Sequence, residues 1–373
     1  MEMRIPLSSP DIDEDDIAGV VSVLRSSRLS LGPMLGSFEQ AVAEYLGITH
    51  AVAVSSGTAG LHLALLALGV GTGDEVIVPS FTFIAAANAI RYVGAQPVFV
   101  DIDASTLNLD PERVESSITA RTRALLIVHT FGVPAEMDSL MQLAKRHGLL
   151  VIEDACEAIG AEYKGRRLGT FGDAGTFAFY PNKQITTGEG GMVVARDGDV
   201  AASIRSLRNQ GRRKGDSWFE HSDLGYNYRI SEMNCALGLS QLKRIDKILE
   251  RRAAVAEEYD VLLRGSSELT LPPLSLPDRI ISWFVYVVRL NARFSAAQRD
   301  VIRNSLVANG IGCGRYFAPI HLQPSYRSIL LEKLHLPVTE SEAERTLALP
   351  FFNHLTKAQV MEVAENLLGA LHP

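Results

Sequence analysis

Short apolar runs of strand length alternate with helical patterns from about residue 52 to residue 194. The runs lie at residues 51–54, 75–78, 97–100, 124–128, 149–152, 175–179 and 192–195. Strands that alternate with helices predict a parallel sheet, because each crossover helix returns the chain to the same edge. We therefore predict an α/β fold with a mostly parallel, doubly wound central sheet and helices on both of its faces.

The pattern changes in the last third of the chain. A stretch rich in Ala, Leu, Arg and Glu predicts one long helix over residues 231–262. Beyond two consecutive prolines, the pattern predicts a strand, a helix and a terminal helix at residues 282–290, 296–309 and 357–371. We therefore expect a large domain over residues 1–248, N-terminal segment included, and a smaller C-terminal α+β domain over residues 249–373.

Composition and charge narrow the class of protein. The chain has 373 residues, of which 47% are hydrophobic and 21% charged, as in an ordinary globular protein. Its net charge of −7 gives no support for a nucleic-acid or anionic-membrane surface. One local basic run fits a solvated face, a site for a substrate diphosphate, or a contact with a partner subunit. It consists of Arg205, Arg208, Arg212, Arg213 and Lys214.

Cysteine usage and the chain's start suggest a location. Cys156, Cys235 and Cys313 are odd in number and far apart, so neither a disulfide framework nor a zinc site is predicted. The first residues lack the apolar core of a signal peptide, and no apolar run is long enough to cross a bilayer. We expect a cytoplasmic protein without a metal centre or membrane contact.

A lone lysine is the strongest candidate for covalent chemistry. Lys183 lies in the stretch YPNKQITTGEGG, in which glycines break the chain. Glycines let the backbone approach a bound cofactor closely. A lysine amine becomes a useful nucleophile when it is desolvated or lies beside other positive charge. We predict a Schiff-base lysine; the alternative is an ordinary solvated side chain.

A carboxylate suited to a pyridoxal phosphate ring follows a buried apolar run. The run at residues 149–152 ends in Glu153 and Asp154. In open α/β sheets, ligands bind outside the carboxyl ends of the strands. A pyridoxal phosphate ring needs a carboxylate beside its pyridinium nitrogen, and Asp154 fits that role. The alternative is that Asp154 caps the turn that follows it.

Two further segments suit the rest of that cofactor. Gly57, Thr58 and Ala59 follow a short strand and begin a helix, where free backbone N–H groups favour a phosphate. The alternative there is a simple helix N-cap. Phe83 closes the stretch PSFTF after the next strand and could stack on a flat ring. Its alternative is a place in the hydrophobic core.

These segments, in this order, resemble fold type I pyridoxal-phosphate enzymes, and most closely the nucleotide-sugar aminotransferase family typified by DegT and the perosamine synthases. The resemblance covers essentially the whole chain. It lies in residues 30–33 (SLGP), 56–59 (SGTA), 79–83 (PSFTF), 153–158 (EDACEA), 181–183 (PNK) with the glycine turn, 225–229 (GYNYR) and 319–321 (PIH).

The resemblance implies roles for particular residues. Lys183 would bind the cofactor covalently and move the substrate proton, and Asp154 would pair with the pyridinium nitrogen. Glu157 stands near the phenolic oxygen, where perosamine-type members often carry glutamate. Thr58 and Ala59 match the phosphate cradle. Phe83 matches the aromatic residue that stacks on the ring.

Three more residues and one departure complete the resemblance. Asn227 and Arg229 match a segment that reaches toward the neighbouring subunit's phosphate, which implies a homodimer with shared active sites. His321 matches a histidine near the substrate. Many members have a phosphate-binding serine where this chain has Ala178. Thr176, Tyr180 or a water could replace that serine.

The implied reaction transfers an amino group, with L-glutamate as the expected donor, to a nucleotide-linked keto-sugar in amino-sugar or polysaccharide biosynthesis. Glu157 and the glycine turn favour a 4-keto-6-deoxy sugar; a 3-keto sugar or a cyclitol ketone is the near alternative. A pyridoxal-phosphate-binding regulatory protein would be expected to lack Lys183 or Asp154. A nucleotide-binding oxidoreductase would need Gly-x-Gly-x-x-Gly after the first strand, and residues 55–60 (SSGTAG) lack its first glycine.

Overall fold

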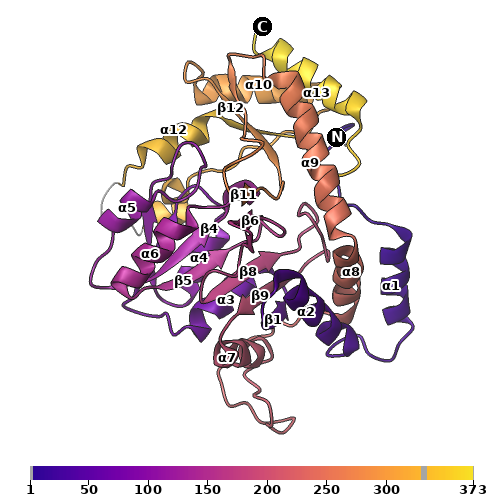
Figure 1. Cartoon of the computed structure of the whole chain (residues 1–373), viewed down its shortest axis with the longest axis vertical. Coiled ribbons are helices and arrows are strands. Elements are labelled where there is room, and N and C mark those ends of the chain that lie inside the picture. The colour runs from indigo at the N-terminus through magenta and orange to yellow at the C-terminus, as the bar shows by residue number, and fades with distance from the viewer. Residues whose placement is uncertain (1–2, 329–333, 373) are drawn as a thin grey trace.

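A seven-stranded sheet forms the centre of the computed structural model, which describes residues 3–328 and 334–372 (Figure 1). Its strand order is β1-β9-β8-β5-β4-β2-β3. The strands are β1 (His50–Val54), β2 (Glu75–Pro79), β3 (Gln96–Val100), β4 (Thr122–Val128), β5 (Leu150–Asp154), β8 (Ala174–Ala178) and β9 (Gly191–Ala195). Only β9 runs antiparallel to its neighbours. The predicted mostly parallel α/β sheet is confirmed.

Alternating side chains bury both faces of this sheet. In β4, Leu125 and Ile127 enter one apolar cluster, whereas Ala124, Leu126 and Val128 enter another. Because successive side chains of a strand point to opposite faces, each strand needs cover on both sides. The covering helices on one face are α2 (Pro33–Leu46), α5 (Pro111–Ser116), α6 (Met137–His147) and α8 (Glu232–Lys243). Those on the other face are α3 (Gly57–Ala67), α4 (Ala85–Tyr92) and α7 (Gly198–Arg208).

A second, antiparallel sheet organises the C-terminal part of the chain. Its strands are β10 (Leu269–Thr270), β12 (Tyr286–Leu290) and β13 (Thr346–Leu349), with β12 in the middle. Around it pack α9 (Ile245–Leu263), α10 (Ala296–Ala308), α12 (Pro337–Arg345) and α13 (Lys357–Ala370) (Figure 1). Ile5 is fully buried in the same cluster, so the N-terminal segment packs against the C-terminal part of the chain.

Short elements connect these parts. A small sheet of β11 (Arg279–Ile280), β6 (Glu162–Tyr163) and β7 (Arg166–Arg167) lies between the two larger sheets (Figure 1). The remaining elements are α1 (Glu14–Leu24), which packs on α8, the single turns η1 (Thr130–Gly132) and η2 (Ile320–Leu322), and α11 (Pro324–Arg327).

Two sequence-based boundaries were wrong. The helix predicted over residues 231–262 is interrupted at Arg244, whose guanidinium binds the carboxylates of Asp11 and Asp16 at 2.8 and 2.7 Å. The strand predicted over residues 282–290 pairs only from Tyr286, because the preceding residues contact the large sheet's loops instead. The domain boundary after residue 248 stays a prediction; it falls near the start of α9.

A buried carboxylate caps α2 from another helix. The N-cap of α2, Gly32, has no side chain to accept its first N–H groups. Glu232 of α8, almost fully buried, accepts from Met34 N at 2.7 Å and from Leu35 N at 3.1 Å. An anion at a helix N-terminus satisfies these donors and interacts favourably with the helix dipole. This contact joins α2 to α8.

We expect Glu232→Ala to lower the free energy of unfolding by about 1–3 kcal/mol, because buried N–H donors lose their partner. Urea unfolding followed by circular dichroism measures the change. Glu250→Ala, at an exposed position of α9, is the control and should leave the urea midpoint unchanged. Equal midpoints for Glu232→Ala and wild type would show that the cap contributes nothing.

Candidate active site

The site lies at the edge where the parallel strands end. β1, β8 and β5 run in one direction and β9 starts from the same edge, so Val54, Gly191 and Ala178 lie side by side in register. Asp154 is the last residue of β5 and lies at the same edge of the sheet. The crevice outside strand carboxyl ends is the usual ligand site of such sheets.

Lys183 lies half-buried in the turn between β8 and β9. Its side chain is 13% exposed, and Nζ lies 3.5 Å from Oε1 of Glu157. The same nitrogen lies 3.8 Å from the centroid of the Phe284 ring. The backbone N–H of Lys183 donates to Tyr180 O and fixes the turn. The alternative of a solvated surface lysine is therefore excluded.

The two carboxylates at the end of β5 point to different surroundings. Glu153 is fully buried and accepts N–H groups from Gly169 and Gly172, and its Oε2 lies 3.0 Å from His129 Nε2. It therefore holds a loop. Asp154 accepts from the backbone N–H of Cys156 at 3.1 Å, so it also caps the following turn. The carboxylate also lies close enough to Lys183 to feel its charge.

Burial changes the acidity of the groups around the amine. It raises the pKa of Asp154, although the Cys156 hydrogen bonds and Lys183 oppose the change. Burial likewise raises the pKa of Glu157, against the charge of Lys183 and the N–H of Phe131, which donates to Glu157 Oε2 at 2.9 Å. Desolvation that disfavours the charged form explains both directions. A cationic ligand beside these carboxylates would offset the cost of burying their charged form.

The start of α3 forms a small cradle. Ser56 is the N-cap, and its hydroxyl accepts from Ala59 N at 3.1 Å. Gly57 must be glycine, because a Cβ there would lie 2.8 Å from both the Ala178 methyl and the Cys156 sulfur. The N-cap interpretation thus holds for Ser56, while the N–H groups of Gly57 and Thr58 have no such cap. They make a place for an anion.

Ala178 stands in the wall of this cradle. Its methyl faces Gly57 at the first residue of α3. Thr176, two residues back along β8, faces Gly60 one turn further into the helix, and its hydroxyl is buried without a partner among the described residues. Tyr180, another proposed replacement for the missing serine, has an exposed side chain. Thr176 stays a candidate replacement for that serine.

Phe83 and His321 have different surroundings. Phe83 is 62% exposed, so its alternative as a core residue is excluded. His321 is buried; its Nδ1 lies 2.7 Å from Ser80 Oγ and its Nε2 lies 3.2 Å from Glu340 Oε1. Burial lowers the pKa of His321, although Glu340 opposes this. The hydrogen bonds of His321 among the described residues do not reach Lys183.

Asn227 and Arg229 lie beside the end of β1 in their own chain. Tyr228 between them accepts the N–H of Ser55 at 2.9 Å. Arg229 donates to Asn209 Oδ1 at 3.1 Å, and Asn227 is exposed. The structure of one chain therefore does not join these two residues to Lys183, and their predicted role toward a neighbouring subunit stays a prediction.

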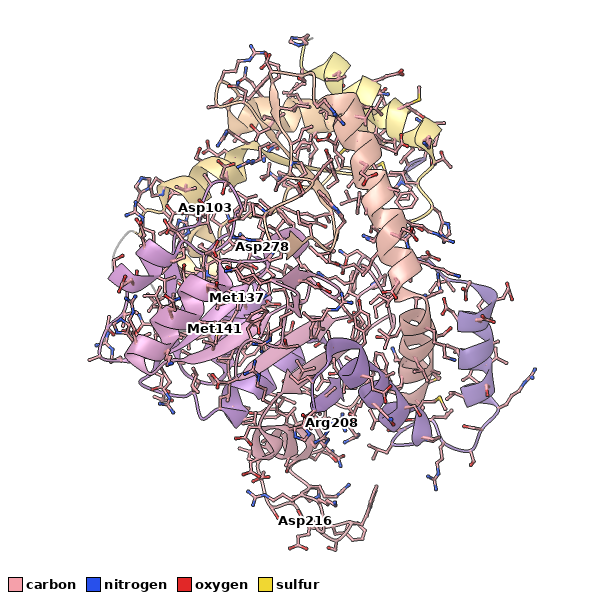
Figure 2. The ribbon with its side chains drawn as sticks, in the orientation of Figure 1. Asp103, Met137, Met141, Arg208, Asp216 and Asp278 are labelled. Carbon is pink, nitrogen blue, oxygen red and sulfur yellow. The ribbon has the colours of Figure 1, made fainter. Side chains whose placement is uncertain are left out.

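The basic run is divided between core and loop. Arg208 is buried, where it pairs with Glu39 and donates to Ala53 O, so a solvated face is wrong for this residue. Arg213 belongs to the loop that projects beyond α7, and it lowers the pKa of Asp223 to about 2 by hydrogen bonding. Figure 2 shows Arg208 at the body and Asp216 on that loop. Both arginines already have protein partners.

Sequence reasoning missed the residues that surround Lys183. Phe284 was part of a predicted strand, and Gln184 seemed only to flank the lysine. Gln184 is buried and donates to Glu157 O at 2.7 Å and to Ser282 Oγ at 2.9 Å. The sequence shows only the position of Gln184 directly after the candidate lysine, because its burial depends on the folded structure.

The described residues contain neither a metal-binding cluster nor a helix that could span a membrane. Within residues 3–328 and 334–372, no group of His, Cys, Asp or Glu side chains is arranged to hold a metal ion. No helix in the described part of the chain has the length and apolarity needed to cross a membrane.

Comparison with known proteins identifies the class and then the family. The fold is that of pyridoxal-phosphate-dependent aminotransferases. One similar solved structure is S. venezuelae DesV in complex with a ketimine intermediate. DesV is 40% identical, with a TM-score of 0.90 over 99% of each chain. The DegT/DnrJ/EryC1/StrS aminotransferase family model matches residues 10–368, so the chain belongs to this family and is an enzyme of this class.

Two other relatives extend the comparison. GDP-perosamine synthase of Caulobacter vibrioides is 42% identical over 363 residues, which cover 96% of each protein. The PLP form of the sugar aminotransferase Spr1654 from Streptococcus pneumoniae is 29% identical, with a TM-score of 0.93 over 98% of each chain. The family resemblance noted in the sequence is confirmed.

We expect Asp154→Asn to raise the melting temperature of the cofactor-free protein near neutral pH. A carboxyl whose folded pKa is raised stabilises the fold below its unfolded pKa of about 3.9 and loses that contribution as the pH rises through the folded value. The difference from wild type should therefore be near zero at about pH 4 and grow toward about pH 8. Differential scanning calorimetry measures it.

The control for this series is Glu365→Gln, which removes an exposed carboxylate on α13 and should change the melting temperature little at either pH. An Asp154→Asn protein that melts below wild type at the higher pH would contradict the assigned burial penalty.

Proposed function

We propose that this enzyme uses pyridoxal 5′-phosphate, held covalently by Lys183, to transfer an amino group from L-glutamate to a keto-sugar nucleotide. The carrying observation is the half-buried amine of Lys183, which contacts Glu157 and whose charge acts on Asp154 at the carboxyl end of β5. Family membership over residues 10–368 supports the reaction class.

The residues around the amine suit this cofactor. Asp154 would face the pyridinium nitrogen, whose positive charge offsets the burial of the carboxylate. The N–H groups of Gly57 and Thr58 would hold the phosphate, with Ala59 completing the first turn of α3. Asn182, next to Lys183, has a buried side-chain oxygen without a partner among the described residues, as expected of a group that meets a ligand.

When bound, the cofactor supplies an electron sink that stabilises charge at the carbon undergoing proton transfer. Lys183 holds and returns the substrate proton at Nζ, and its burial keeps bulk water away from that nitrogen. Glu157 orients the amine through its Oε1, while Phe131 N–H holds the other carboxylate oxygen. Phe83, which is exposed, would cover the ring face.

The favoured substrate is a 4-keto-6-deoxy sugar on a nucleoside diphosphate, for amino-sugar and polysaccharide biosynthesis. The similarity to a GDP-perosamine synthase, 42% identical over 96% of each protein, supports it. A 3-keto sugar or a cyclitol ketone is the alternative acceptor. A pyridoxal-phosphate-binding regulator with little turnover is the alternative of another class, and the retained Lys183 and Asp154 disfavour it.

We further propose a cytoplasmic homodimer with shared active sites. Asn227 and Arg229 would act toward the partner's phosphate site, and His321 would lie near the substrate once the sugar is bound. Sedimentation at assay concentration tests the dimer, since a fully active monomer would contradict it. The three cysteines are free thiols, which suits a reducing compartment.

The decisive experiment is the absorption spectrum of the purified protein before and after L-glutamate. We expect bound cofactor whose band shifts to the pyridoxamine form in wild type and in the control Lys145→Ala, which changes an exposed lysine of α6. Lys183→Ala should show no shift, and its turnover with keto-sugar nucleotides should fall by about 10³-fold or more. Bound cofactor without any response to amino donors would favour the regulatory protein.

We expect Ala178→Ser to bind pyridoxal phosphate more tightly, by about tenfold, because a hydroxyl at the cradle adds one hydrogen bond to a charged phosphate. Fluorescence titration of the cofactor measures the dissociation constant. Ala178→Cys is the matched control, since a thiol of similar size is a weak donor. Equal affinities for the serine and cysteine variants would show that position 178 does not touch the phosphate.

A further inference from the structure

Three residues between β11 and β12 connect the C-terminal part of the chain to the active site. We call Ser282, Trp283 and Phe284 the crossing segment. Pairing between β12 and β13 starts only at Tyr286, so these residues are free of that sheet. Figure 1 shows β11 between the large sheet and the C-terminal helices, and the segment leads away from it.

The backbone of the crossing segment is held from two sides. On the large-sheet side, Ser282 N donates to Gly132 O at 3.1 Å. On the other side, Arg252 of α9 donates from Nε to Trp283 O at 2.6 Å and from Nη2 to Phe284 O at 2.7 Å. Hydrogen bonds from a charged donor are stronger than neutral ones, so this segment has a well-defined position.

Glycine 132 makes the close approach possible. A Cβ at Gly132 would lie 1.7 Å from Ser282 O and 2.9 Å from Glu157 O, and its φ of +82° suits glycine. The crossing segment therefore lies directly against the backbone of Gly132 in η1, close to the carbonyl of Glu157.

Ser282 ties down the neighbours of the reactive amine. Its hydroxyl donates to Ile159 O at 2.6 Å and accepts from Gln184 Nε2 at 2.9 Å. The same Gln184 nitrogen donates to Glu157 O at 2.7 Å. Gln184 directly follows Lys183. Its side-chain amide therefore holds the backbone next to Lys183 and, at the same time, the loop that carries Glu157.

Phe284 provides a surface for the amine itself. The ring is 3% exposed and belongs to an aromatic cluster with Phe81, Phe131 and Phe317. The Lys183 nitrogen lies 3.8 Å from its centroid. The face of an aromatic ring attracts an ammonium group and therefore favours one position of the lysine side chain. Nζ contacts both this ring and the carboxylate of Glu157.

We infer that Phe284 and Ser282 are positioning residues for Lys183: Phe284 directs the amine through its ring face, and Ser282 fixes the lysine backbone through Gln184. The inference rests on the proposed function, because capture of the cofactor aldehyde is the task assigned to Lys183. It gives the C-terminal part of the chain a share in a site otherwise built by the large sheet.

The test compares covalent capture with simple binding. Wild type and Phe284→Leu are freed of cofactor and mixed with pyridoxal phosphate; stopped-flow absorbance and borohydride trapping on Lys183 report capture. Pyridoxine 5′-phosphate, which lacks the aldehyde, reports binding alone. We expect Phe284→Leu to capture about tenfold more slowly, which corresponds to 1.36 kcal/mol, and to bind pyridoxine phosphate within about twofold of wild type.

Two further variants separate direction of the amine from packing. Phe284→Tyr keeps the ring face and should restore most of the capture rate. Phe294→Leu makes the same substitution in the buried C-terminal cluster, away from Lys183, and should capture like wild type. Ser282→Ala should slow capture less than Phe284→Leu, because Gln184 keeps its bond to Glu157 O. Phe284→Met, whose unbranched side chain adapts to irregular gaps in a core, replaces the leucine variant if that variant does not fold.

Different results would overturn different claims. A Phe284→Leu protein that captures as fast as wild type overturns this inference alone. So does parallel loss of capture and of pyridoxine phosphate binding without rescue by tyrosine, since Phe284 would then be only structural. A wild-type protein that forms no covalent complex with pyridoxal phosphate overturns the proposed function and this inference with it.

Discussion

Burial of two carboxylates beside one amine is the interaction on which the active site depends. Asp154 and Glu157 are each 8% exposed, and the fold must offset the loss of their hydration. It does so with backbone donors from Cys156 and Phe131 and with the charge of Lys183. The partial compensation leaves both carboxyl pKa values raised. A site in this condition favours a cationic ring.

The backbone accepts strain to supply these donors. Phe131 has a φ of +59°, which a non-glycine residue adopts rarely and at a cost of about 1–3 kcal/mol. Its ring stacks on Phe317 with centroids 5.3 Å apart, and its N–H reaches Glu157. Packing of the aromatic cluster thus holds Phe131 in the backbone conformation from which its N–H donates to Glu157. Such strain persists only where the surroundings over-determine the backbone.

Local signals explain how much of this could be predicted from sequence. Apolar runs of strand length located the central strands, and a carboxylate after a buried run identified Asp154. A helix start rich in small residues likewise identified Gly57. The break at Arg244 and the late start of strand pairing at Tyr286 escaped prediction. Both result from contacts with residues far away in the sequence, which periodicity does not record.

The same long-range contacts link the active site to the chain's beginning and end. Arg252 holds the crossing segment and also donates to Asn353 Oδ1 at 3.0 Å, and Asn353 in turn donates to Asp11 Oδ2 at 2.8 Å. Asp11 pairs with Arg244 where the helical stretch breaks. The position of Phe284 therefore depends on residues spread over the whole sequence. A lysine that looked like a local motif is held by the assembled tertiary structure.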